Sequence, residues 1–199
     1  MLGQGAPAVE CDRVRTIGDA FWSCGRPIAM LYTRDEKVAM HEAAHAVVAI
    51  RMGGIVYWID KTPSTVAGIH SEAATNWTTP DGQIQDAYAV IAAGRALELM
   101  LEADGQLERD GTVQDRAIMV ERFPDSTPED FEDAARRVRN LLTEDSMITA
   151  MEYVTQAYLA EGSTRVNGKH LHALVDPLLY PEGRSADDKA QEIINSLPE

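Results

Sequence analysis

The chain has 199 residues, of which 45% are hydrophobic but only 6% aromatic, a composition that fits one domain with a core of Ala, Leu, Val, Ile and Met. Because alanine is the best helix former and lets helices pack closely, we expect a mainly α (α+β) fold. The formal net charge of −14 argues against nucleic-acid or membrane-surface binding, since phosphate backbones and anionic headgroups repel an acidic protein.

Residues 1–30 are expected to form an N-terminal extension. They carry several glycines and prolines and show no clear hydrophobic period. Cys11 and Cys24 lack the spacing of a metal site, so we expect reduced thiols. No basic segment followed by an apolar run is visible, which leads us to expect a cytoplasmic protein.

The main domain is expected over residues 31–178 and begins with a helix. Residues 33–36 (TRDE) have the form of a capping box, which predicts a helix over 34–52 that ends at two glycines. Residues 55–59 are β-branched and aromatic and predict a strand. A second strand over 66–71 is expected to return beside it, giving a small β-hairpin or short sheet.

Further helices are expected downstream. Small and apolar residues at helical spacing predict a long helix over 83–102, followed by another over about 112–123. A strong start signal then opens residues 127–162, which we expect to form one long helix or two consecutive ones. A short helix over 167–175 precedes a polar C-terminal tail, which we place at 179–199.

The first predicted helix contains the pattern H-E-x-x-H, formed by His41, Glu42 and His45. Residues four apart on a helix share a face, so both imidazoles can bind one metal ion. Catalytic zinc takes three protein ligands and a water, whose pKa it lowers to about 7. Glu42 is the candidate general base, which takes the proton of the water and passes it to the leaving amine.

The third ligand cannot be chosen from spacing alone. The extended pattern H-E-x-x-H-x-x-G-x-x-H is excluded, because Val48 and Arg51 replace its glycine and last histidine. By residue type the remaining candidates are His70, Glu72, Glu98, Asp115, His170 and His172. The last two histidines are two apart on a predicted helix, so they point to different faces and are poor joint ligands.

Three segments together resemble the FtsH-type zinc metallopeptidases. Residues 38–49 (VAMHEAAHAVVA) are similar to the zinc helix of that family. Residues 92–98 (AAGRALE) resemble its L-A-G-R-A-A-E segment, and residues 111–117 (GTVQDRA) resemble its G-A-S-N-D segment. Residues 158–164 show a weaker similarity. The resemblance covers about residues 30–176.

The resemblance implies a helical bundle that carries the H-E-x-x-H helix, with the small hairpin next to the metal site. It implies that His41 and His45 are zinc ligands, that Glu42 is the base, and that Asp115 is the third ligand. Glu98 is the rival ligand, or an acid that orients an imidazole. The hairpin either pairs with an extended substrate or only covers the core.

Departures from the family restrict the expected activity. The sequence lacks the nucleotide-binding pattern G-x-x-x-x-G-K-[ST] of an ATPase module, and its longest apolar stretch is too short to span a membrane. Ala44 replaces a glycine of the family, and Leu99 stands where a second acid is common. We therefore expect a zinc endopeptidase that cuts peptides and unfolded or flexible protein segments, alone or with a separate ATPase or unfoldase partner.

Two other functions fit the same motif. One is a regulatory peptidase resembling the ImmA type, which also uses H-E-x-x-H and cuts a dedicated partner. The other is a catalytically degenerate zinc-bound domain that serves as an adaptor. The sequence predicts no particular oligomeric state.

Overall fold

The computed structural model describes residues 32–66, 69–80, 84–103, 112–160, 163–184 and 189–198. In this part of the chain the fold is mainly helical with a small antiparallel sheet, as predicted. The helices are α2 (Arg34–Arg51), α3 (Ile84–Ile91), α4 (Ala93–Ala103), α5 (Val113–Arg122), α6 (Pro128–Leu142), α7 (Asp145–Leu159), α8 (Gly168–Leu179) and α9 (Lys189–Ser196). The strands are β1 (Ile55–Asp60), β2 (Ser64–Val66), β3 (Ile69–Ser71), β4 (Ala74–Thr78) and β5 (Arg165–Asn167). The predicted N-terminal extension, with both cysteines, lies outside the described residues.

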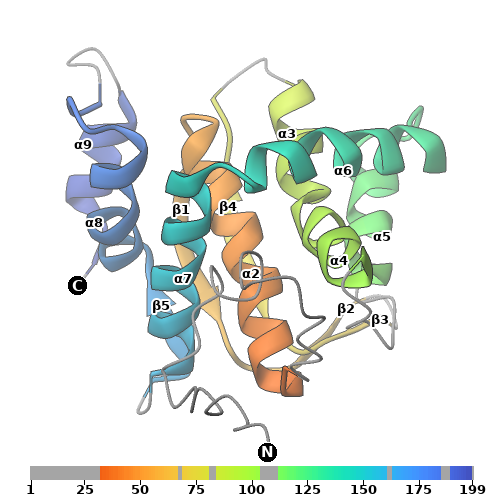
Figure 1. The fold of residues 1–199 in the computed structure, drawn as a ribbon, viewed down its shortest axis with the longest axis horizontal. Coiled ribbons are helices and arrows are strands. Elements are labelled where there is room, and N and C mark those ends of the chain that lie inside the picture. Colours follow the sequence, from red (N-terminus) through yellow and green to blue (C-terminus); the bar gives the residue numbers. More distant parts are fainter. Residues whose placement is uncertain are drawn as a thin grey trace, which may run out of the picture.

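Helix α2 runs through the middle of the structure, with α7 and α4 packed against it (Figure 1). Its predicted capping box is confirmed: the Thr33 hydroxyl accepts from the Glu36 N–H, and the Glu36 carboxylate accepts from the Thr33 N–H. From Ala39 to Ile50 every residue except His41 is buried. The small alanines on this helix allow the neighbouring helices to approach closely, which makes α2 the centre of the core.

The downstream helices follow the predicted order with one difference. The long helix expected over 83–102 is interrupted at Ala92, which separates α3 from α4. The region after Thr127 forms two consecutive helices, α6 and α7, which break at residues 143–144. A capping box between Thr127 and Asp130, with Pro128 in the first turn, starts α6 as its sequence indicates.

The sheet corrects the predicted hairpin. Strand β1 lies in the centre of a three-stranded antiparallel sheet with the order β4-β1-β5, while β2 and β3 pair only with each other. Ile59 of β1 pairs with Thr75 of β4 and with Val166 of β5. Local patterns could not reveal β5, because it reaches β1 from about a hundred residues further along the chain.

The segment that we expected to be a polar tail contains helix α9. Ala190, Ile194 and Leu197 on this segment are buried against Ile55 of β1, with Tyr57 partly buried beside them. These apolar residues recur at helical spacing, so the sequence did carry the signal for a docked amphipathic helix. They form a small second cluster beside the main core.

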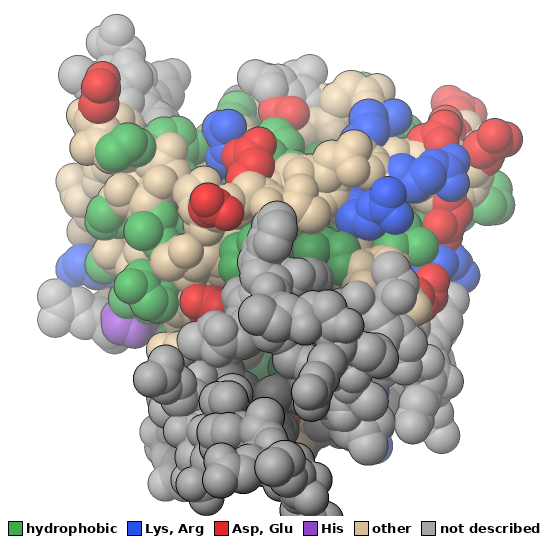
Figure 2. Space-filling view, viewed as in Figure 1, with side chains coloured by type: hydrophobic (Ala, Val, Ile, Leu, Met, Phe, Trp, Pro, Cys, Tyr) green, Lys and Arg blue, Asp and Glu red, His purple; other side chains and the backbone are tan. Residues whose placement is uncertain are grey.

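The surface of α6 carries acidic and basic side chains side by side (Figure 2). Among these is an exposed pair between Arg136 and Asp133. No helix in the described ranges combines the length and the apolar character that crossing a membrane requires.

A buried polar network fastens α8 to the sheet. His172 is almost fully buried, and its Nε2 accepts the Val56 N–H at 3.1 Å. The Nδ1 of the same ring lies 3.3 Å from Asp176 Oδ1, and Arg184 Nη2 donates to that oxygen at 3.0 Å. Burial acts to raise the pKa of Asp176, but the hydrogen bonds from His172 and Arg184 outweigh it, so the pKa is lowered. His172 therefore holds the fold together and lies outside the metal site.

We predict that Asp176→Asn lowers the free energy of unfolding at neutral pH by about 1–3 kcal/mol, the range for hydrogen bonds to a charged group. Because the folded-state pKa of Asp176 is depressed, its contribution is present above the unfolded pKa of about 3.9 and is lost as pH falls through the folded value. Denaturant unfolding should therefore show the two proteins converging below about pH 4. The exposed Asp133→Asn is the control and should change stability by less than about 0.5 kcal/mol. A difference that stays constant with pH would contradict this account.

Candidate metal centre

Three side chains meet at one point between α2 and α5. His41 and His45 lie one turn apart on α2, and their Nε2 atoms are 3.1 Å from each other. Asp115, in the first turn of α5, places its Oδ2 3.4 Å from each of these nitrogens. The structure thus brings together the two histidines of the motif and the acid that the resemblance nominated. In the described residues they form a group that could hold a metal ion.

The spacing of the three atoms is compatible with ligands around one metal ion. Zinc binds nitrogen and oxygen ligands at about 2.0–2.1 Å in tetrahedral arrangement, which puts neighbouring ligand atoms about 3.3 Å apart. The three observed distances lie close to that value. Asp115 Oδ2 is also buried, and no described group makes a hydrogen bond to it. A buried carboxylate oxygen at this position needs a compensating cation, which protonated imidazoles or a bound metal ion can supply, so the donor set is compatible with a metal ion.

The second nitrogen of each imidazole faces an oxygen from another element, and that of His45 makes a hydrogen bond. His45 Nδ1 lies 2.7 Å from the backbone oxygen of Val90, which fixes the proton on Nδ1 and turns Nε2 toward the other ligands. His41 Nδ1 lies 3.8 Å from Oε1 of the buried Glu98. Glu98 therefore stands behind an imidazole, in the position of an acid that orients a ligand, and lies outside the triangle.

Gly94 provides the space for the His41 ring. A Cβ atom added at this glycine would lie 2.2 Å from His41 Cε1 and 2.5 Å from Nε2. Any larger residue must therefore push the imidazole away. The glycine of the A-G-R segment is explained by this close approach, which spacing along the sequence does not show.

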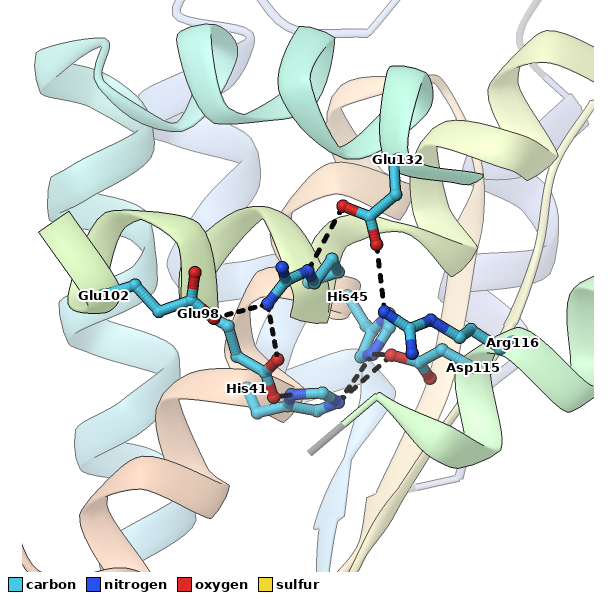
Figure 3. A network of polar contacts seen from close by, with 8 residues as sticks. His41, His45, Glu98, Glu102, Asp115, Arg116 and Glu132 are labelled. Carbon is cyan, nitrogen blue, oxygen red and sulfur yellow. Dashed lines mark hydrogen bonds and ion pairs between the residues drawn. The ribbon is translucent and has the colours of Figure 1, made fainter. Parts of the chain in front are cut away.

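A chain of ion pairs connects Glu98, behind His41, to Arg116, next to Asp115 (Figure 3). Arg95 on α4 lies 3.6 Å from Glu98 Oε2 and contacts Glu132 of α6 at 3.4 Å. Arg116, next to Asp115 on α5, contacts the other oxygen of Glu132 at 3.0 Å. Glu132 thus joins α4 to α5 behind the candidate ligands, and its two pairings, unlike the i,i+3 pair of Arg95 with Glu98, could not be found from sequence alone.

The charges of the three groups are strongly coupled. Burial acts to lower the pKa of His45, but the adjacent Asp115 carboxylate outweighs it and raises that pKa to about 9. The pKa of His41 is also raised, because Asp115 outweighs the effect of burial there as well. Burial conversely acts to raise the pKa of Asp115, and the two imidazoles lower it overall. Without a metal the site is therefore an ion pair, and a bound metal would displace imidazole protons.

Glu42, the candidate base, is buried next to the ligands and is held by the sheet. Thr75 of β4 donates its hydroxyl to Glu42 Oε2 at 2.7 Å, and the same hydroxyl lies 3.1 Å from the Glu42 carbonyl oxygen. This contact crosses from helix to edge strand. Sequence reasoning did not identify Thr75, since nothing near it in the chain links it to the motif.

The site opens into a cavity of about 890 Å³. His41, His45, Glu42 and Asp115 all line it, so the three ligand atoms face a space that a water and a substrate could enter. Residues 74–77 of strand β4 form another part of its wall. A metal held by three protein ligands beside such a cavity has the open position that catalytic sites retain.

The other candidate ligands lie elsewhere. Glu72 lines the cavity but pairs with Arg34 at its rim. His170 is exposed on α8, and His172 belongs to the network behind the sheet. His70 lies in β3, and its side chain is outside the described part of the structure.

Comparison with known proteins identifies no family for this chain. The sequence matches no protein-family model, and no curated protein is similar enough to count as a relative. Functional inference for this chain therefore depends on the site itself.

We predict that Gly94→Ala weakens zinc binding by roughly 10- to 100-fold, because the new methyl displaces the His41 ring. The metal-free protein should lose no more than about 1–3 kcal/mol of stability, since the displaced ring must repack and the higher helix propensity of alanine offsets part of that cost. Competitive chelator titration gives the affinity, and denaturant unfolding gives the stability. His41→Ala serves as the benchmark for loss of one ligand. Wild-type affinity in Gly94→Ala would refute the proposed packing role.

Proposed function

We propose that this chain is a zinc-dependent endopeptidase that cuts flexible segments of peptides and proteins. The main support is the convergence of His41, His45 and Asp115 on one point at the wall of a cavity, with the Glu42 carboxylate beside them. Two imidazole nitrogens and one carboxylate oxygen form a donor set that zinc accepts in catalytic sites. The structure supports a metal ion, and the choice of zinc is part of the proposal.

Bound zinc supplies Lewis-acid chemistry at this site, because it acidifies a water molecule and polarises a carbonyl group. Glu42 takes the proton of the attacking water and then delivers it to the nitrogen of the departing amine. Thr75 keeps the Glu42 carboxylate in one orientation through its 2.7 Å hydrogen bond. Glu98 and the Val90 carbonyl keep the imidazoles in place, so that the protein need not reorganise during the reaction.

Strand β4 is the surface that we propose for binding the substrate backbone. It stands at the edge of the three-stranded sheet and lines the cavity beside Glu42. An extended peptide can add to such an edge through main-chain hydrogen bonds, which gives affinity with little sequence preference. We therefore assign binding of the substrate backbone to β4 and not to the hairpin expected from the sequence, because Thr75 of β4 contacts the candidate base Glu42.

The similarity of the three sequence segments to FtsH-type peptidases is part of this proposal. The resemblance assigned Asp115 to the metal and left Glu98 as the rival, and the observed geometry agrees with that assignment. A cavity of about 890 Å³ admits an extended segment and excludes a folded domain. We therefore propose that the enzyme acts on accessible chain, or receives unfolded chain from a separate ATPase.

We predict that the purified protein binds about one zinc ion per chain and hydrolyses an unfolded protein such as casein. Glu42→Gln should retain the metal and lose at least about 100-fold in rate, because the amide cannot accept the proton of the water. Elemental analysis and a fluorescent casein assay provide the two measurements. Zinc retention without turnover in wild type would favour a binding or adaptor domain. Cleavage of one dedicated partner and not of casein would favour a regulatory peptidase.

We predict that Thr75→Val lowers kcat by roughly 10-fold with little change in KM or zinc content, because it removes only the hydrogen bond to the base. Thr75→Ser, which keeps a hydroxyl, should recover most of the rate. Thr78→Val makes the same chemical change on the same strand, away from Glu42, and should behave as wild type. Equal rates for Thr75→Val and Thr78→Val would exclude a positioning role for Thr75.

A further inference from the structure

The charges that line the cavity are of two kinds, those that already have a partner and those that do not. The acids among its described lining residues, Glu42, Glu72, Glu98 and Asp115, each contact a hydroxyl, a cation or an imidazole. Among the described cations of the lining, Arg34 is paired with Glu72. The acids of the cavity are therefore committed to the protein itself.

Lys37 and Arg122 are the cations that remain. Within the described residues neither forms an ion pair, although both line the cavity. Lys37 is half-buried on α2. Arg122 is exposed at the end of α5, and its guanidinium lies 5.0 Å from the centre of the Trp77 ring. Lys37 and Arg122 therefore offer positive charge at the wall of the cavity, in a chain whose net charge is −14.

The two cations lie on different helices that line the cavity beside strand β4. Lys37 is one turn before His41 on α2, about 6 Å along the helix axis, and three residues after Arg34, whose partner Glu72 lies two residues before β4. Arg122 is two turns beyond Asp115 on α5, about 10 Å along that helix, and contacts Trp77 of β4. A peptide bound along the cavity can therefore meet one cation from α2 and one from α5.

We propose that the cleft selects acidic peptide segments, with Asp or Glu on both sides of the scissile bond. This inference rests on the proposed function and gives it a substrate class. Lys37 pairs with the acid on one side, and Arg122 pairs with the acid on the other. Both pairs form at the rim of the cavity, where each contributes a modest gain and fixes the register of the peptide.

The overall negative charge of the protein opposes an acidic substrate only weakly at physiological salt. The Debye length is then about 8 Å, so charges on distant surfaces are screened, whereas the two rim cations act within a few ångströms. The cations therefore decide the preference at close range. Their role is selection among bound peptides and not long-range attraction.

The test uses three peptides of one sequence that carry Glu, Gln or Lys on both sides of the scissile bond. Affinities are measured by fluorescence anisotropy on zinc-loaded Glu42→Gln protein, and cleavage is measured on wild type. We expect Glu to be preferred over Gln, and Gln over Lys, by roughly two- to fivefold for each side. Lys37→Glu should reverse the preference on one side, and Arg122→Glu should reverse it on the other.

Arg139→Glu is the matched control, because it makes the same charge change at an exposed residue of α6 that does not line the cavity. It should leave the peptide preference and the rate unchanged. Equal affinity for all three peptides, or the same loss of preference in Arg139→Glu, would overturn the inference. Cleavage without a charge preference would overturn it while leaving the peptidase intact. A charge preference in binding without any cleavage would support the acidic-peptide cleft and reject the peptidase.

Discussion

The burial of polar side chains on helix α2 is the constraint on which the rest of the structure depends. His45 and Glu42 are buried among alanines and valines, an environment that penalises unpaired polar groups. Each receives its partner from a different element: Val90 contacts His45, and Thr75 contacts Glu42. The other elements must therefore be placed accurately around α2, and the same accuracy brings Asp115 to the metal position.

In this fold the geometry of the site depends on close packing of the helices around it. The alanines of α2 let α4 and α7 approach closely, and Gly94 lets the His41 ring fit beside α4. The Glu132 carboxylate then links α4 to α5 at the level of the ligands. A change far from the candidate metal centre can thus move one of its side chains, because the supports of the histidines and of Asp115 belong to one connected set of contacts.

The proposed functions of the cleft follow from which groups are already satisfied. The carboxylates around the candidate metal centre already contact imidazoles, a hydroxyl or guanidinium groups. We therefore assign them to the reaction and not to the selection of substrate charge. The edge of β4 offers backbone groups, and Lys37 and Arg122 offer positive charge at the wall of the cavity. Catalysis, backbone binding and side-chain selection are thereby assigned to separate parts of one cavity.

The sequence by itself determined the helical class, the extent and cap of α2, and the choice of His41, Glu42 and His45, because these depend on local spacing. The predicted short sheet is present, but local spacing could not determine its pairing: β1 pairs with β4 and with the distant β5, so the expected pairing of residues 55–59 with 66–71 was wrong. The tertiary structure alone brought Asp115 to the histidines and Glu98 behind His41, since residues on separate helices meet only through packing. Thr75 contacts Glu42, and Gly94 lies against His41, for the same reason. A motif fixes which atoms share a helix face, whereas their partners are fixed by the fold.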